Sequence, residues 1–418
     1  MAFAQGWSTL AVAYKSNSQY HSSQMFEHIV LRRSEAGTPV SAGQIAQALL
    51  FYKKVHVILD VGSFRTLIGS VGPEGLLALL ARPDFSAVYS EETLATVTNV
   101  VGPMKVHTFD AMTVTGHETV GIRKSTAERI EFHLNRQGIT GRRAKEFTRR
   151  FLQYVPVRKL TGDHFRSGGL IEAARQDLRD AEYVHAAVRR ILSLLPEGGD
   201  PGTGLKFEVL ETELGNYVFE NIDFGSINGR RAQQVPPLEP LTVAHILNQL
   251  QEARTDLELA AHYGGDFVTS TTTSGVIQVR HEALLRRTGI NLAAQQTFLE
   301  VTLPDMPMIA ELIDSGERSF ADFMRLYERS VKFKQWLSAA TPDTGLVREY
   351  LLAASSQDWI RTSEAKLIRY LFTGAVSLVD PTLGVAAGLT DKFFVDKIFA
   401  GWRPNHFVDG KLKPFLSP

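Results

Sequence analysis

The residues best suited to chemistry lie in a stretch from His262 to Gly275 that crosses two glycines and then presents a run of hydroxyl side chains. His262, Asp266 and Ser270 are of the types used in acid–base or nucleophilic catalysis. Glycines permit close backbone approach, and hydroxyls with free amides at a helix N-terminus hold phosphates and other anions. The pattern therefore makes this loop a candidate hydrolase or phosphate-handling site.

A structural interpretation of the same loop is simpler. Gly264 and Gly265 end one helix, and Thr273 or Ser274 caps the next. The loop lacks the lysine of a phosphate-binding loop and matches neither the nucleophile elbow nor the dinucleotide fingerprint. Both interpretations stay open.

A second set of candidate residues is basic. Residues 123–159 hold eleven Lys or Arg against three Glu, a formal excess of eight positive charges. Two helices separated by Gly138 and Gly141 are expected there, and the second carries the candidate partner-binding residues Arg142, Arg143, Lys145, Arg149 and Arg150. This arrangement loosely resembles a helix-turn-helix. Contact with nucleic acid, a charged surface facing the chain itself or a protein partner, and anionic lipid are the alternatives.

No metal or cofactor is predicted. The chain has no cysteine, so disulfides, thiolate catalysis and Cys-ligated zinc are excluded, and its histidines are scattered without ligand spacing. Asp60 follows the most apolar strand, where α/β proteins place catalytic acids, but an Asp there is usually a turn residue.

Composition sets wider limits. The 418 residues are 44% hydrophobic and 22% charged, with equal numbers of acidic and basic side chains, which is ordinary globular composition. We expect residues 1–23 to be poorly ordered, and they show no basic region before an apolar run, as a signal peptide would. The expected location is cytoplasmic.

The first half predicts a mixed sheet region. Strands are expected at 25–31, 55–60 and 85–89, and a further pair at 105–109 and 111–115. Ser41 is the expected cap of a helix reaching Tyr52. Short helices at 64–68 and 73–80 and one long helix at 169–195 complete this half.

The second half is mainly helical. A loop at 196–204 rich in Gly and Pro marks the preferred domain boundary, and a hairpin follows at 205–213 and 217–221. Thr242 is the expected cap of a helix through His262. Further helices are expected at 276–285, 292–300, 307–313, 320–327 (capped by Ser319) and 331–337.

The most apolar stretch, 370–389, carries one charge, Asp380, directly before Pro381. Since that pair interrupts the run, two short helices forming a Gly/Ala-rich hairpin are expected. Burial in the core, an oligomer interface and insertion into a membrane are the alternatives.

The predicted fold class is α+β and predominantly α-helical: a small mixed N-terminal sheet region precedes a helical C-terminal region closed by the hairpin. The predicted domains are 24–196 and 205–418. The first functional hypothesis is a cytoplasmic, non-enzymatic interaction or regulatory protein that self-associates as a homo-oligomer or binds a protein partner. The alternatives are a nucleic-acid-binding protein acting through 123–159, for example in host defence, a hydrolase or phosphate-handling enzyme at 262–275, and a membrane-active protein inserting 370–389.

Overall fold

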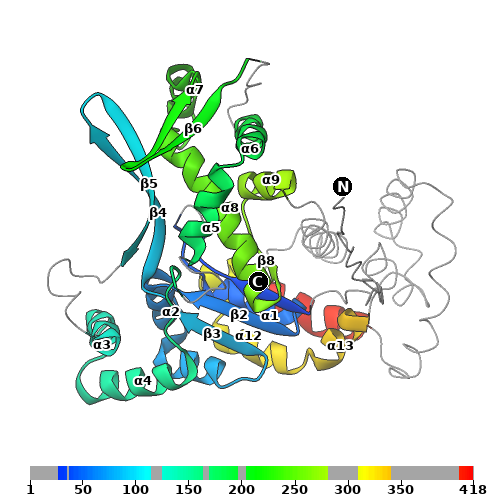
Figure 1. The fold of residues 1–418 in the computed structure, drawn as a ribbon. Coiled ribbons are helices and arrows are strands. Elements are labelled where there is room, and N and C mark those ends of the chain that lie inside the picture. The colour runs from blue at the N-terminus through cyan, green and yellow to red at the C-terminus, as the bar shows by residue number, and fades with distance from the viewer. Residues whose placement is uncertain are drawn as a thin grey trace, which may run out of the picture.

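The computed structural model describes residues 27–34, 37–113, 125–162, 169–195, 204–280, 309–339 and 404–417. The fold is α+β and mostly helical, with an N-terminal sheet region and a helical C-terminal region, which confirms the predicted class (Figure 1). The predicted hairpin at 370–389 and the stretch 1–23 lie outside the described residues. Within the described ranges, no helix has both the length and the apolarity that crossing a bilayer requires.

Sheet A is parallel and has the strand order β3-β2-β1-β8. Its strands are β1 (His28–Leu31), β2 (Lys54–Leu59), β3 (Phe85–Tyr89) and β8 (Asp266–Phe267). Nearly every residue of β2 is buried, as expected of a parallel strand covered on both faces. Ile29 of β1 is in register with Val55 on one side and with Asp266 on the other.

Two helices connect the first three strands: α1 (Ala42–Phe51) and α2 (Val61–Leu80). The predicted Ser41 cap of α1 is confirmed, because Ser41 and Gln44 form a capping box. The two short helices expected at 64–68 and 73–80 are the two halves of α2. A kink separates them at Gly72, whose φ of 72° places it in the left-handed region before Pro73.

Sheet B is antiparallel and has the order β4-β5-β7-β6. Its strands are β4 (Glu92–Val101), β5 (Met104–Thr113), β6 (Phe207–Thr212) and β7 (Gly215–Glu220). The predicted pairing of 105–109 with 111–115 is wrong, because both fall within β5, which pairs with β4. The turn lies instead at Gly102 (φ 60°), followed by Pro103. The hairpin predicted at 205–221 is confirmed as β6 and β7.

Four helices follow sheet B's first hairpin: α3 (Thr126–Arg136), α4 (Gly141–Tyr154), α5 (Gly169–Leu178) and α6 (Ala181–Ser193). The prediction of one helix over 169–195 is wrong, because the chain breaks at Arg179 and Asp180. The Asp180 carboxylate accepts a hydrogen bond from the Tyr183 amide at 3.0 Å and so caps α6. Apolar residues keep the helical spacing across this break, which is why periodicity missed it.

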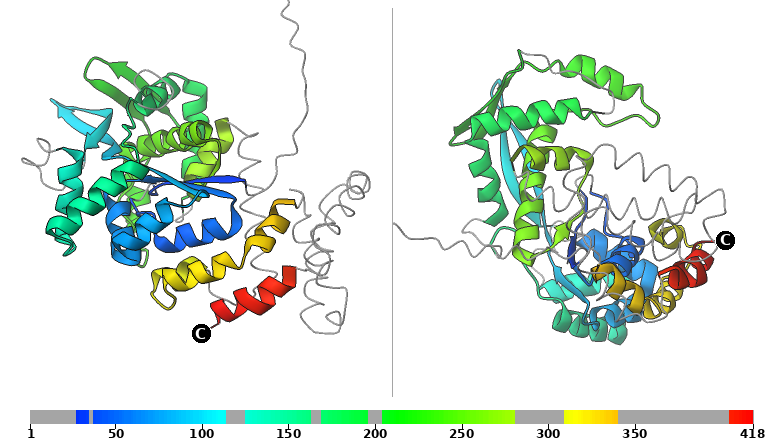
Figure 2. Two further views of the ribbon diagram at one scale, coloured as in Figure 1. Left: turned by 90° about the horizontal axis from the view of Figure 1, so that it is seen from below. Right: turned by 90° about the vertical axis from the view of Figure 1, so that its right-hand side faces the viewer.

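The remaining described helices all lie in the second half of the chain. They are α7 (Phe224–Ala232), α8 (Val243–Tyr263), α9 (Thr271–Arg280), α11 (Ile309–Asp314), α12 (Phe320–Glu328), α13 (Val331–Ala339), α17 (Pro404–Phe407), the π-helical turn η3 (Val408–Leu412) and α18 (Lys413–Leu416). The predicted caps Thr242 of α8 and Ser319 of α12 are confirmed. Figure 2 shows the C-terminal helices beside α13, where the Phe333 and Phe407 rings stack at 4.8 Å.

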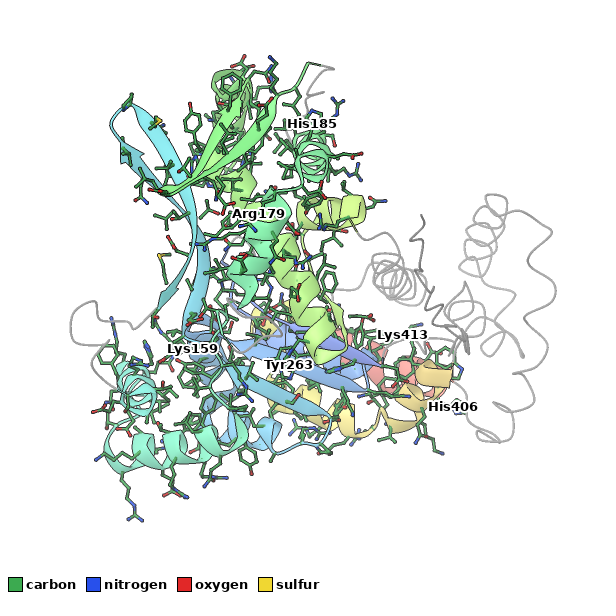
Figure 3. The ribbon with its side chains drawn as sticks, in the orientation of Figure 1. Lys159, Arg179, His185, Tyr263, His406 and Lys413 are labelled. Carbon is green, nitrogen blue, oxygen red and sulfur yellow. The ribbon has the colours of Figure 1, made fainter. Side chains whose placement is uncertain are left out.

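The long helix α8 links the two sheets. At its C-terminal end, the Tyr263 ring stacks on His56 of β2 with 3.9 Å between centroids (Figure 3). Farther back, α8 packs with α5, α6 and sheet B in one apolar cluster that includes Leu250 and Phe109. Each sheet therefore combines strands from both sides of the 196–204 loop: β8 joins sheet A, and β6 and β7 join sheet B. The domain boundary expected at 196–204 stays a prediction.

Candidate functional site

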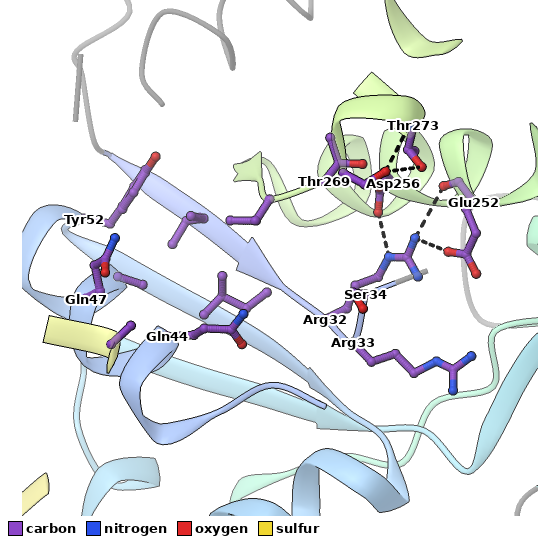
Figure 4. A pocket seen from close by; sticks show the side chains of 16 residues that line it. Arg32, Arg33, Ser34, Gln44, Gln47, Tyr52, Glu252, Asp256, Thr269 and Thr273 are labelled. Carbon is purple, nitrogen blue, oxygen red and sulfur yellow. Dashed lines mark hydrogen bonds and ion pairs between the residues drawn. The ribbon is translucent and has the colours of Figure 1, made fainter. Parts of the chain in front are cut away.

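A pocket of about 420 Å³ lies beside β1 and reaches the carboxyl ends of β1 and β8 (Figure 4). The chain leaves β1 through α1 toward β2, whereas β8 joins the opposite side of β1. The order of strands therefore reverses between β1 and β8, and open α/β sheets bind ligands at such switch points. The volume falls within the usual range of roughly 300–1,000 Å³ for small-molecule sites.

Both halves of the chain supply the walls of this switch-point pocket. The contributions of β1, the loop after it and α1 are Ile29, Leu31, Arg32, Arg33, Ser34, Gln44, Gln47, Ala48 and Tyr52. Those of α8, the segment after β8, α9 and α11 are Glu252, Asp256, Val268, Thr269, Ser270, Thr273 and Ala310. Ten of these sixteen residues are polar or charged, and such groups fix the orientation and specificity of a bound ligand.

A buried ion cluster forms one end of the pocket. Arg32 Nε donates to Asp256 Oδ1 at 2.7 Å, and its Nη2 donates to Glu252 Oε2 at 2.5 Å. The two carboxylates are four residues apart on α8 and so lie on one helix face. This cluster ties the end of β1 to α8.

Burial sets the electrostatics of the cluster. It raises the pKa of Asp256 above its ordinary value, although Arg32 and Thr269 act in the opposite direction. Burial alone would lower the pKa of Arg32, but the two carboxylates raise it, so the guanidinium keeps its charge. Arg33 also lines the pocket, which therefore contains two cationic and two acidic side chains and is formally neutral.

The N-terminus of α1, where dinucleotide-binding folds hold a phosphate, is already occupied. Asp314 of α11 accepts hydrogen bonds from Ser41 Oγ at 2.6 Å and from the Gly43 amide at 2.9 Å. The Ser41 amide donates to Gln44 Oε1 at 3.0 Å. Because the chain's own Asp314 and Gln44 side chains accept from these donors, this end does not favour a nucleotide phosphate.

A buried acceptor lies along the α1 wall. The side-chain oxygen of Gln47 is buried and receives no hydrogen bond from the described part of the chain. A buried polar atom without a partner costs about 1–3 kcal/mol. A ligand that donates a hydrogen bond to Gln47 would remove that cost.

The residues predicted for catalysis divide between the pocket and its surroundings. Ser270 lines the pocket and caps α9, its Oγ accepting from the Thr273 amide at 3.1 Å. The predicted caps Thr273 and Ser274 are therefore wrong by one turn, because the helix begins at residue 271. Asp266 is buried in β8, and His262 is exposed on α8. Neither is among the described residues that line the pocket.

The other predicted residues have clear positions. Arg142, Arg143, Lys145, Arg149 and Arg150 are all exposed on α4. Asp60 caps α2, since its carboxylate accepts from the Ser63 amide at 2.7 Å. In the described ranges, no group of three or more His, Asp or Glu side chains could hold a metal ion.

The fold and the pocket define an open parallel α/β sheet with a polar switch-point site, joined to an antiparallel sheet by α8. Comparison of the chain with protein-family models, with curated proteins and with solved structures gives no match. The pocket's own chemistry is therefore the basis for a functional proposal.

Proposed function

We propose that the protein is a non-enzymatic binding protein that holds a small, neutral molecule rich in hydrogen-bond donors in the switch-point pocket. Sugars, nucleosides and zwitterionic amino acids belong to this class. The observation that carries the proposal is the pocket's lining, where Arg32, Glu252 and Asp256 form one end and the Gln47 side chain lies on the α1 wall.

The balance of donors and acceptors supports this ligand class. The pocket's formal charge is zero, so a strongly charged ligand would lack compensation. Arg32 donates to both carboxylates, an arrangement that fixes them in place rather than leaving one free as a base. Gln47 adds an acceptor that lacks a donor in the described structure.

A ligand in the switch-point pocket would lie between two parts of the chain, and this position could couple binding to their packing. The pocket's walls come from β1 and α1 on one side and from α8 and α9 on the other. A ligand contacting both sides would stabilise their packing, and its binding energy would shift any equilibrium between packed and loosened arrangements. This supports the hypothesis of a regulatory interaction protein.

Thermal unfolding of the purified protein tests the proposal. We expect at least one of ribose, adenosine and glutamine to raise Tm, because a ligand at 100 times its Kd adds about 2.7 kcal/mol of stability. Gln47→Leu should reduce the shift by removing the acceptor, whereas Gln153→Leu on exposed α4 should leave it unchanged. If none of the three raises Tm, the proposal is wrong. A rise with pyrophosphate alone would favour the phosphate-handling alternative.

A further inference from the structure

The helix α4 has two chemically distinct faces. Ala144, Phe147 and Phe151 are buried, and the Phe147 and Phe151 rings pack against Phe64 of α2 with centroids 6.2 and 5.3 Å away. The opposite face carries the five basic residues predicted from the sequence, all exposed. Figure 3 shows long side chains projecting from α4 away from the body of the molecule.

Acidic neighbours neutralise only part of this basic face. Arg143 donates to Glu74 at 2.9 Å, and Arg149 lies 3.7 Å from Glu146, both as exposed pairs that contribute little stability. Arg142, Lys145 and Arg150 have no ion pair within the described structure. A local positive excess therefore remains, although the whole chain is formally neutral.

We propose that the exposed face of α4 binds the phosphate backbone of duplex nucleic acid without reading its sequence. Positive charge on one face of a protruding helix is the electrostatic signature of such binding. Residues 142 to 150 span about 12 Å along the helix, at ~1.5 Å per residue. That length suits the major groove of DNA, which is roughly 12 Å wide.

The structure favours duplex nucleic acid over the other polyanions. Helices that bind membranes insert an apolar face, but the apolar face of α4 is already packed in the protein core. Single strands are bound by rows of aromatic residues. Tyr154 is the sole aromatic among the exposed residues of α4, so a stacking platform is missing from that helix.

Salt-dependent binding to a 24-base-pair duplex of mixed sequence tests this proposal. The variant Arg142→Gln, Lys145→Gln, Arg150→Gln should bind at least tenfold more weakly than the wild type at 100 mM salt. The slope of log affinity against log salt should fall by about 2.7, because each lost phosphate contact removes ~0.9. Far-ultraviolet circular dichroism and Tm establish that the variant is folded.

The matched control removes the same charge elsewhere. Arg329→Gln, Lys332→Gln, Lys411→Gln changes three exposed cations outside α4 and should alter affinity by less than twofold. Equal losses in both triple variants, or no duplex binding by the wild type at 20 mM salt, would overturn the proposal. Tighter binding to the single strand of the same sequence, or to vesicles of phosphatidylcholine and phosphatidylserine, would also overturn it.

Discussion

Lys334 shows how burial changes the chemistry of a single residue. Its Nζ donates to the Tyr327 hydroxyl at 2.5 Å, and that hydroxyl donates to Asp84 at 2.5 Å. Burial lowers the pKa of Lys334 to about 8, although Asp84 partly opposes the shift. The ammonium therefore loses its proton far more readily in the folded protein than in the unfolded chain.

This shift predicts an unusual dependence of stability on pH. Between about pH 8 and 10.5 the unfolded chain binds the Lys334 proton and the folded protein does not, so stability from this group rises with pH. Relative to Lys334→Met, the wild type should gain about 2 kcal/mol between pH 7 and 10. Urea unfolding at both values measures the difference.

The neighbouring exposed Lys332 provides the control for this prediction. The stability difference between the wild type and Lys332→Met should change by less than about 0.5 kcal/mol over the same range, as expected for a surface site. A flat difference for Lys334→Met as well would show that the ammonium is not buried in solution.

At the scale of elements, the contact between α1 and α11 leaves no room for a side chain at Gly43. A Cβ built there would lie 2.3 Å from the Ala310 carbonyl oxygen, and Ala310 lines the pocket. We expect Gly43→Ala to destabilise the protein by about 2 kcal/mol, as overpacking does. Chemical denaturation measures this loss.

Replacing Gly69 of α2 by alanine should raise stability, in contrast to Gly43→Ala. A Cβ there meets nothing within 4 Å, and the residue is exposed. Gly69→Ala should therefore stabilise the protein by about 0.5–1 kcal/mol, because alanine loses less backbone entropy in a helix. A Gly43→Ala variant as stable as the wild type would contradict the close packing of α1 on α11, and a loss of stability in Gly69→Ala would contradict the open space at that position.

Local signals explain which elements could be predicted from the sequence. Ser41, Thr242 and Ser319 bond to amides in their own first helical turn, so adjacent residues carry the information. The break before α6 depends on the Asp180 cap, and the long pairing of β4 with β5 depends on the turn at Gly102. Asp and Gly also occur inside helices and strands, so hydrophobic periodicity alone could not locate this break and this turn.

The pocket was beyond prediction for a different reason. Arg32 and Glu252 are separated by 220 residues, and only the pairing of β1 with β8 and the course of α8 bring them together. Their charges look like those of surface residues in the sequence. Among the predicted catalytic residues, Ser270 alone is one of the described residues that line the pocket, so the sequence pattern and the pocket share only this part of the loop.

At the scale of the molecule, sheet B is covered unequally. Phe109, Val209 and Val218 on one face pack with α5, α6 and α8. The strand register places another set of large apolar side chains on the opposite face, all at least 37% exposed: Val101, Met104, Leu210 and Phe219, with Met112 eight residues along β5 from Met104. Such a concentration of exposed apolar residues is typical of an interface.

The sequence favours self-association through the helical half of the chain, and sheet B offers a different surface for the same test. A second copy is the partner we predict, because a two-fold axis would bury this face against itself and homodimers are the commonest oligomers. Its strands would then pack as two aligned sheets about 10 Å apart. The acidic Asp110 and Glu208 share this face, so the two copies must be offset enough to keep those carboxylates apart.

Sedimentation velocity over a range of protein concentrations measures this association. Leu210→Ser with Phe219→Ser should weaken self-association at least tenfold, since each side chain is about half exposed and contributes its apolar area to the contact. Val235→Ser with Val331→Ser removes two apolar side chains elsewhere that are 95% and 56% exposed, and should leave the association constant unchanged. A wild type that stays monomeric at every concentration, or two double variants that weaken association equally, would show that this face of sheet B does not join copies of the chain.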